Sequence, residues 1–153
     1  EDGTAFAEAP LLRGTVLVRY FTEGHAPEAG AVFAAPEYLR SSRVFAAAAR
    51  ARYGMRIEAV TETADGDIRY RVAGGGDIVL ARDADTDVVL DNLDALLASE
   101  AFSHLRSDTF AYIDFRFGNK IFVKESATPE SASRSEAFTL PPTTDGTGRT
   151  ENP

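Results

Sequence analysis

The chain of 153 residues is long enough for one globular domain, and its hydrophobic content of 44% is sufficient for a core. Its formal net charge of −8 comes from acids scattered along the whole length. This argues against nucleic acid and against the bare surface of an anionic membrane as partners, because both require clustered Lys and Arg side chains. The absence of cysteine excludes disulfide frameworks, thiolate zinc sites and cysteine nucleophiles.

The first third of the chain predicts a loose start, a strand and a helix. Residues 1–14 carry small and acidic side chains with little pattern, whereas 15–21 are rich in β-branched and aromatic residues and favour a strand. One of the serines at 41–42 is expected to N-cap a helix over 43–53, since the alanines there favour helix. Gly54 stands where helices commonly end in a left-handed glycine.

Three runs of residues, 55–63, 68–73 and 77–82, predict a meander of strands. The first run alternates, with Met55, Ile57 and Ala59 on one face and Arg56, Glu58 and Val60 on the other, as a half-buried strand does. Asp65-Gly66 is a tight-turn signal between the first and second runs, and the glycines at 74–76 give a second turn. These short turns predict antiparallel pairing of consecutive strands.

The next part of the chain predicts a helix and a terminal hairpin. Asp85 or Thr86 is expected to cap a helix over about 87–103. Its apolar side chains recur at i, i+4, i+7 and i+8, the stripe of a helix that packs on a sheet. Residues 109–115 and 119–124 then form the last two expected strands.

The element order predicts an α+β domain over 15–125, with a mostly antiparallel sheet and two helices packed on one face. After Glu125 the composition shifts to Ser, Thr, Pro, Gly and Glu. Residues 126–153 are therefore expected to be a disordered tail, because they cannot bury enough apolar surface to offset the entropy of ordering. Phe138-Thr139-Leu140 within this tail has a second interpretation, as a short docking peptide.

Few residues in the sequence point to metal binding. His25 lies near Glu23 and Glu28, a set that suits a small metal-dependent hydrolase, but the spacing matches no regular ligand geometry. His104 follows the second expected helix near its C-terminus, where an imidazolium favours the helix dipole, so capping or packing is its expected role. We therefore expect neither a metal site nor a cofactor.

Two further motifs have structural explanations. The acidic run at 83–87 resembles the start of a calcium loop, but Val88 and Asp94 stand where such a loop needs Gly and Glu. Its acids are expected to cap the helix that follows. The glycines at 74–76 are followed by neither Lys-Ser/Thr nor a helix start, so they indicate a turn and not a phosphate loop. With no Gly-x-Ser-x-Gly motif either, we expect that the chain is not an enzyme.

The most informative stretch of the sequence runs from residue 112 to residue 124. By the two-residue period of a strand, Tyr112, Asp114 and Arg116 share one face, and the apolar residues at 113, 115 and 117 share the other. Asp114 and Arg116 are close enough to pair, or each meets a neighbour across the sheet. A terminal hairpin with one polar face explains this pattern without any function.

The same stretch resembles the end of the extracytoplasmic β domain of the FtsQ/DivIB cell-division family. There a strand of the form Tyr-[Ile/Val]-Asp-[Leu/Phe/Met]-Arg-[Phe/Tyr] leads into the last strand, and this chain has Tyr112-Ile113-Asp114-Phe115-Arg116-Phe117. The order of helix, meander and helix before it is also similar, so the resemblance extends over 30–125.

The resemblance implies a non-catalytic scaffold of the division machinery on the extracytoplasmic (periplasmic or cell-wall) side of the cell membrane. It implies protein partners of the FtsB/FtsL or DivIC/FtsL type, which add a strand to the edge of the terminal hairpin. Membrane contact is expected only through an anchor outside this chain. Position by position, Arg116 and Phe117 match family residues implicated in contact. The strand that receives the partner matches Asn119, Lys120, Ile121, Phe122 and Val123.

Other interpretations of the chain remain open at this point. Lysines on a strand edge, here Lys120 and Lys124, also serve to block unwanted pairing, so the edge is either a docking edge or a protected one. A second interpretation is another extracytoplasmic subunit of an envelope or surface assembly, and such a subunit would self-associate. The metal-dependent hydrolase built on His25 is the alternative among enzymes.

Overall fold

The computed structural model describes residues 18–23, 28, 30–32, 34–126 and 135–140. Within these residues the chain forms two helices and one seven-stranded sheet. The elements are β1 (Arg19–Thr22), α1 (Pro36–Tyr53), β2 (Ile57–Glu62), β3 (Ile68–Val72), β4 (Asp77–Leu80), α2 (Thr86–Ala98), β5 (Phe110–Phe117), β6 (Lys120–Glu125) and β7 (Ser135–Thr139). The expected loose start at 1–14 and the first residues of the strand expected at 15–21 lie outside the described residues.

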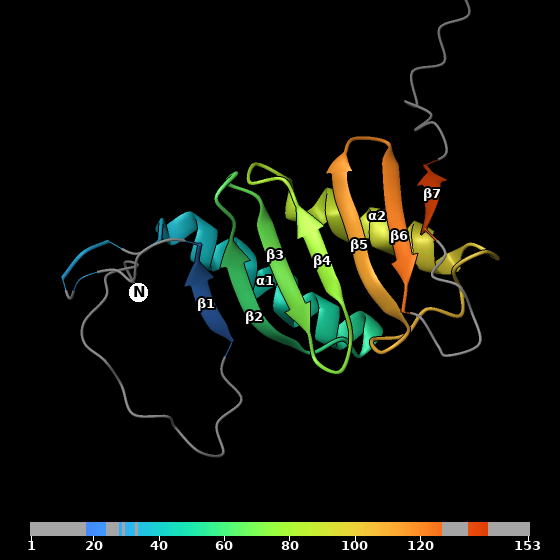
Figure 1. Cartoon of the computed structure of the whole chain (residues 1–153), viewed down its shortest axis with the longest axis horizontal. Helices are drawn as coiled ribbons and strands as arrows, with labels where there is room; N and C mark the ends of the chain where they lie inside the picture. The colour runs from blue at the N-terminus through green and yellow to red at the C-terminus, as the bar shows by residue number, and fades with distance from the viewer. Residues whose placement is uncertain (1–17, 24–27, 29, 33, 127–134, 141–153) are drawn as a thin grey trace, which may run out of the picture.

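The strands lie side by side in chain order, and both helices cover the same face of the sheet (Figure 1). Neighbouring strands are antiparallel except for β1–β2 and β4–β5, which are parallel. Each parallel pair is connected by a helix, because the chain has to cross over the sheet before it can run again in the same direction. The expected α+β fold, with a mostly antiparallel sheet and two helices on one face, is confirmed.

Helix α1 begins at Pro36. The start at residue 43 that a serine cap predicts is therefore wrong. Proline suits the first turn of a helix because its missing N–H would be unsatisfied there in any case. Ser42 is buried inside the helix, and its Oγ accepts a hydrogen bond from the hydroxyl of Tyr70 at 3.3 Å. The expected C-terminus is confirmed, since Gly54 has a φ of 68° and its N–H donates to the carbonyls of the last turn.

Helix α2 begins where predicted and ends earlier. The Asp85 carboxylate accepts hydrogen bonds from the N–H groups of Asp87 and Val88, so the acidic run caps the helix as expected. The helix ends at Ala98, and the next residue donates its hydroxyl to a carbonyl of the last turn at 2.6 Å. His104 therefore lies beyond the helix, and its Nε2 is 3.2 Å from a carboxylate oxygen of Glu125, which corrects its expected place at the helix end.

The core lies between the helices and the sheet. Each strand from β2 to β6 contributes one side chain to a cross-strand row that is at most 4% exposed: Val60, Tyr70, Ile78, Ile113 and Val123. Helix α1 adds Phe45, whose ring lies 4.5 Å from that of Tyr70, and α2 adds Leu93, which is fully buried. Removing such side chains from water stabilises the fold by roughly 1.5–3 kcal/mol each, so this row fixes which face carries the helices. In the described part no helix is long and apolar enough to cross a membrane.

Strand β7 departs from the sequence prediction. The prediction of a disordered tail over 126–153 is wrong for Ser135–Thr139, because these residues pair antiparallel with β6. Phe138 packs on the core, with its ring perpendicular to that of Phe102 at a centroid distance of 6.1 Å. One packed aromatic residue and a backbone ladder therefore offset the ordering entropy of this short segment. The rest of the expected tail, 127–134 and 141–153, lies outside the described residues.

The turn between β3 and β4 packs against the chain that enters β5. The N–H of Gly75 donates to the carbonyl of Val72 at 3.1 Å, so the glycines form the expected turn. A Cβ atom on Gly75 would collide with the backbone of Ser107, and one on Gly76 with the backbone of Ala111. These glycines therefore also allow the second half of the sheet to lie beside the first.

Gly76→Ala should lower the free energy of unfolding by about 2–4 kcal/mol, because the new methyl group meets backbone that cannot move aside. Gly74→Ala is the matched control. It has open space around the new Cβ but a φ of 76°, so it should cost only about 1 kcal/mol. Urea unfolding of the two variants measures the difference, and equal losses would contradict the close approach at Gly76.

Stability should fall at alkaline pH. Burial raises the pKa of Tyr70 to about 12, above the value of about 10 for an unfolded tyrosine. The folded state holds this proton more tightly, so the contribution is complete below about pH 10 and is lost as the pH rises toward 12. Urea unfolding at pH 8 and pH 11 should show the loss. Tyr70→Phe should reduce the loss by about 1–2 kcal/mol, and an unchanged alkaline slope would contradict the assignment to Tyr70.

Candidate partner-binding edge

The terminal hairpin, β5 and β6, is turned by Gly118 at a φ of 64°. Its register is shifted between Asp114 and Phe117, which pair with Phe122 and Lys120. Two residues of β5 therefore face a single residue of β6, the geometry of a β-bulge. The bulge changes the face on which the end of β5 presents its side chains.

Phe117 lies on the helix-free face because of this bulge. Residues paired across antiparallel strands share a face, and Lys120 and Phe122 alternate with Ile121, which is fully buried on the helix side. The ring of Phe117 is perpendicular to that of Phe122 at a centroid distance of 5.0 Å, and the residue is 52% exposed. The sequence prediction that Phe117 shares the buried face of Ile113 is therefore wrong.

Asp114 and Arg116 pair with each other, one of the two arrangements that the sequence allows. The Arg116 guanidinium donates to Asp114 Oδ2 at 2.6 Å, and the Arg116 backbone N–H donates to Asp114 Oδ1 at 3.0 Å. Asp114 is 6% exposed, so its carboxylate depends on this cation. The neighbouring Tyr112 is half-buried on the same face.

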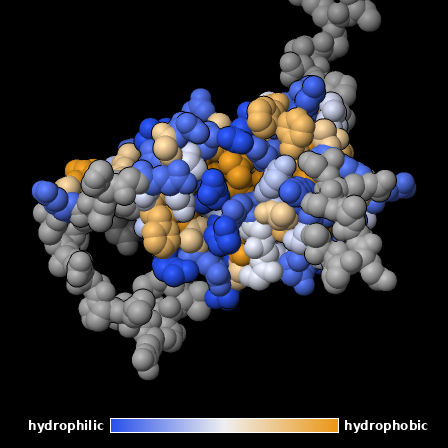
Figure 2. Space-filling view, in the orientation of Figure 1, coloured by the Kyte–Doolittle hydropathy of each residue, from blue (hydrophilic) through white to orange (hydrophobic). Residues whose placement is uncertain are grey.

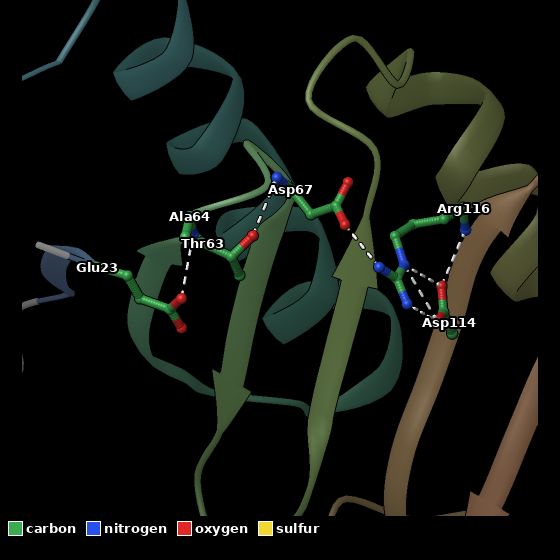
Figure 3. Close-up of polar contacts among 6 residues, drawn as sticks. All are labelled: Glu23, Thr63, Ala64, Asp67, Asp114 and Arg116. Atoms are coloured by element: carbon green, nitrogen blue, oxygen red, sulfur yellow. Dashed lines mark hydrogen bonds and ion pairs between the residues drawn. The ribbon is translucent and has the colours of Figure 1, made fainter.

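Arg116 also reaches a carboxylate that sequence reasoning did not find. Its second terminal nitrogen donates to Asp67 Oδ2 at 2.6 Å, at the end of the turn that precedes β3 (Figure 3). These two carboxylates hold the pKa of the Arg116 guanidinium above its usual value. Asp67 is itself fixed by a hydrogen bond from its N–H to the hydroxyl of Thr63 at 3.2 Å. The cluster connects the start of β3 to the end of β5 across β4.

Strand β6, the expected receiving strand, is paired on both sides. It pairs with β5 on one side and with β7 on the other, where Ile121 lies opposite Phe138 and Phe122 opposite Ala137. The carbonyl of Asn119 accepts the N–H of Leu140 at 2.9 Å, which extends the ladder by one residue. The backbone groups that the sequence assigns to a partner strand are therefore occupied by the chain itself.

The side chains of β6 divide into two sets. Ile121 and Val123 are at most 1% exposed and belong to the core. Lys120, Phe122 and Lys124 alternate with them and lie on the helix-free face. Of the expected contact residues on β6, only Lys120 and Phe122 lie on the helix-free face, whereas Ile121 and Val123 hold the strand in place.

The metal set proposed at Glu23, His25 and Glu28 is only partly covered by the described residues. His25 lies outside the described residues. The Glu23 carboxylate accepts the N–H of Ala64 at 3.1 Å (Figure 3). It also lies 3.8 Å from Arg69. Among the described residues no group of three His, Cys, Asp or Glu side chains is placed to hold a metal ion.

A hollow of about 400 Å³ opens beside the first turns of the helices. Its lining includes Tyr38, Ser42 and Tyr70 and the ion pair between Glu62 and Arg82, whose atoms lie 2.6 Å apart. Burial raises the pKa of both tyrosines, that of Tyr70 to about 12. At neutral pH both hydroxyls therefore keep their protons and do not act as bases, and that of Tyr70 donates to Ser42.

No known protein family has a model that matches this chain, and no curated protein is significantly similar to it. The assignment of the edge therefore depends on the geometry of β5, β6 and β7 and on the motif at 112–124.

Arg116→Gln should lower the free energy of unfolding by about 2–3 kcal/mol, because it leaves Asp114 buried without a cation. Arg71→Gln is the matched control, since Arg71 pairs with Asp77 on the same face but is 55% exposed and should cost less than about 1 kcal/mol. Adding Asp114→Asn to Arg116→Gln should restore part of the loss. Thermal unfolding of the variants tests this, and equal effects of Arg116→Gln and Arg71→Gln would contradict the argument.

Proposed function

We propose that this domain is a non-catalytic interaction module that binds an extended segment of a protein partner by strand addition along β6. The proposal includes the role that the resemblance implies, a scaffold of the FtsQ/DivIB type on the extracytoplasmic face of the membrane. Its partners are then FtsB/FtsL-type or DivIC/FtsL-type proteins. The motif from Tyr112 to Lys124 supports this role, since it makes up the hairpin to which the family's partner strand adds.

The observation that carries the proposal is the pairing of β6 with β7. The segment 135–139 follows a connection, 126–134, that is longer than the loops of about two to five residues in ordinary hairpins. It nevertheless pairs with β6 over five residues in regular register. Backbone hydrogen bonds depend little on sequence, so an edge that accepts this segment also accepts another strand of suitable pattern.

The partner would replace β7 in this mode of binding. Strand β7 and the residue after it hold the sheet through two large apolar side chains, Phe138 and Leu140, both only partly buried. Short edge segments with few buried contacts open at a low free energy compared with the whole domain. Replacement of β7 then leaves the core row and the Asp67–Arg116 pair in place.

Phe122→Glu should weaken binding of an FtsB- or FtsL-type extracytoplasmic segment from the same cells by at least about tenfold, while the circular dichroism spectrum stays unchanged. The reason is that the Phe122 side chain lies next to the incoming strand on the helix-free face. Phe21→Glu is the control, because Phe21 lies in the same cross-strand row at the opposite edge and is 46% exposed.

Isothermal titration calorimetry measures both affinities. Unchanged binding of the Phe122→Glu variant, or equal losses in the two variants, would contradict binding at β6. Sedimentation of the wild-type chain as a concentration-dependent oligomer, abolished by Phe122→Glu, would favour the self-associating assembly subunit instead.

A further inference from the structure

We propose that the partner strand carries acidic residues opposite Lys120 and Lys124 and a large apolar residue between them, opposite Phe122, and that β7 holds the same register with weaker side chains. This inference rests on the proposed function, since it assumes that a strand is added at β6. It specifies the chemistry of the partner.

The register of β7 shows which positions of an incoming strand meet these side chains. Lys124 lies opposite Ser135, Phe122 opposite Ala137 and Lys120 opposite Thr139. All three positions of the incoming strand face the helix-free side, because they alternate with Phe138 on the helix side. A partner strand in this register therefore places successive outward side chains opposite Lys124, Phe122 and Lys120.

The two lysines are not neutralised within the part of the chain that the structure describes: neither takes part in an ion pair there. On neighbouring strands of the same face, Arg71 pairs with Asp77 and Arg116 pairs with Asp67. The chain carries 24 acidic residues and a net charge of −8, so acids are plentiful. Opposite charges directly across a strand pair stabilise pairing, and β7 offers only hydroxyl-bearing residues at these positions.

The apolar surface between the lysines is also incompletely covered. The rings of Phe117 and Phe122 contact each other, and Phe117 remains 52% exposed. The residue of β7 opposite Phe122 is Ala137, whose methyl group covers little of a ring. Figure 2 shows hydrophobic side chains gathered at this end of the terminal hairpin, next to hydrophilic residues over the central strands. Leucine or a similar residue in place of Ala137 would bury more of this aromatic pair.

The helix side of the incoming strand has a different requirement. Phe138 lies opposite Ile121 and meets the ring of Phe102 edge to face. A partner needs an apolar residue at this position to keep the core closed. The complete pattern is acidic, any, apolar, apolar, acidic, apolar, in the direction of β7.

The tether gives β7 an advantage that a partner has to overcome. A strand that belongs to the same chain as the strand it pairs with has an effective concentration on the order of millimolar. A partner of equal intrinsic affinity would therefore displace little of β7 at micromolar concentration. Lys120 and Lys124, which form no ion pair among the described residues, and the partly exposed rings of Phe117 and Phe122 provide interactions that β7 does not use. These interactions distinguish a partner strand from β7.

The probe is a synthetic peptide of residues 135–140 with Ser135→Glu, Ala137→Leu and Thr139→Glu. The matched peptide carries Ser135→Lys, Ala137→Leu and Thr139→Lys. Both are titrated into the full chain with Phe138→Asp, which weakens the hold of β7, and binding is followed by fluorescence anisotropy and by hydrogen exchange of the β6 amides. The acidic peptide should bind about tenfold more tightly than the basic one.

A charge reversal on the protein provides the control. In the full chain with Phe138→Asp, Lys120→Glu and Lys124→Glu the order of the two peptides should reverse. Net charge alone favours the basic peptide for this acidic chain, so a preference for the acidic peptide requires the local lysines. Circular dichroism checks that each variant is folded.

The outcomes separate this inference from the function on which it rests. If both peptides protect the β6 amides with equal affinity, strand addition stands and the acidic partner is wrong. If the Phe138→Asp variant exposes the β6 amides but neither peptide protects them, the proposed function fails as well. If these amides stay protected only at high protein concentration, a second copy of the chain occupies the edge and the proposal is overturned.

Discussion

The parallel contact between β4 and β5 is the constraint on which the rest of the structure depends. It joins the half of the sheet that carries β1 to β4 to the half that carries β5 to β7, and α2 is the crossover that it requires. Gly76 allows the backbones to approach, and the Arg116–Asp67 ion pair spans the same seam at the helix-free face. Without this seam the terminal hairpin would have no fixed place beside the meander, and the core row would be interrupted between Ile78 and Ile113.

Because both helices cover the same face of the sheet (Figure 1), the two sides of each strand have different roles. The helix side of β6 supplies core residues, whereas its other side presents Lys120, Phe122 and Lys124. The β-bulge before the turn adds Phe117 to that second set. A scaffold that binds by strand addition needs this division, because the core residues keep the receiving strand flat and ordered while the outward side chains choose the partner. Strand β7 uses the first set through Phe138 and leaves the second largely unused.

Much of the fold could be predicted because its signals are local. The Asp65-Gly66 turn, the glycines at 74–76 and the Asp85 cap each depend on residues close together in sequence. The alternation expected in β2 is wrong at Val60, because a register shift between Ile57 and Ala59 places Val60 in the core beside Tyr70. The start of α1 was harder to place, because proline at a first turn competes with a serine cap as a start signal, and burial of Ser42 against Tyr70 decides between them. Propensity alone does not contain that tertiary contact.

The sequence by itself determined the α+β class, the one-sided sheet, the terminal hairpin and the pairing options of Asp114 and Arg116. Only the tertiary structure decided three features of the candidate site. Asp67 joins Arg116 across a separation of 49 residues, Phe117 changes face at a bulge, and the segment 135–139 occupies the edge of β6. Each depends on contacts between distant parts of the chain, whose free energy appears only when the sheet is assembled, whereas periodicity and turn chemistry act over a few residues.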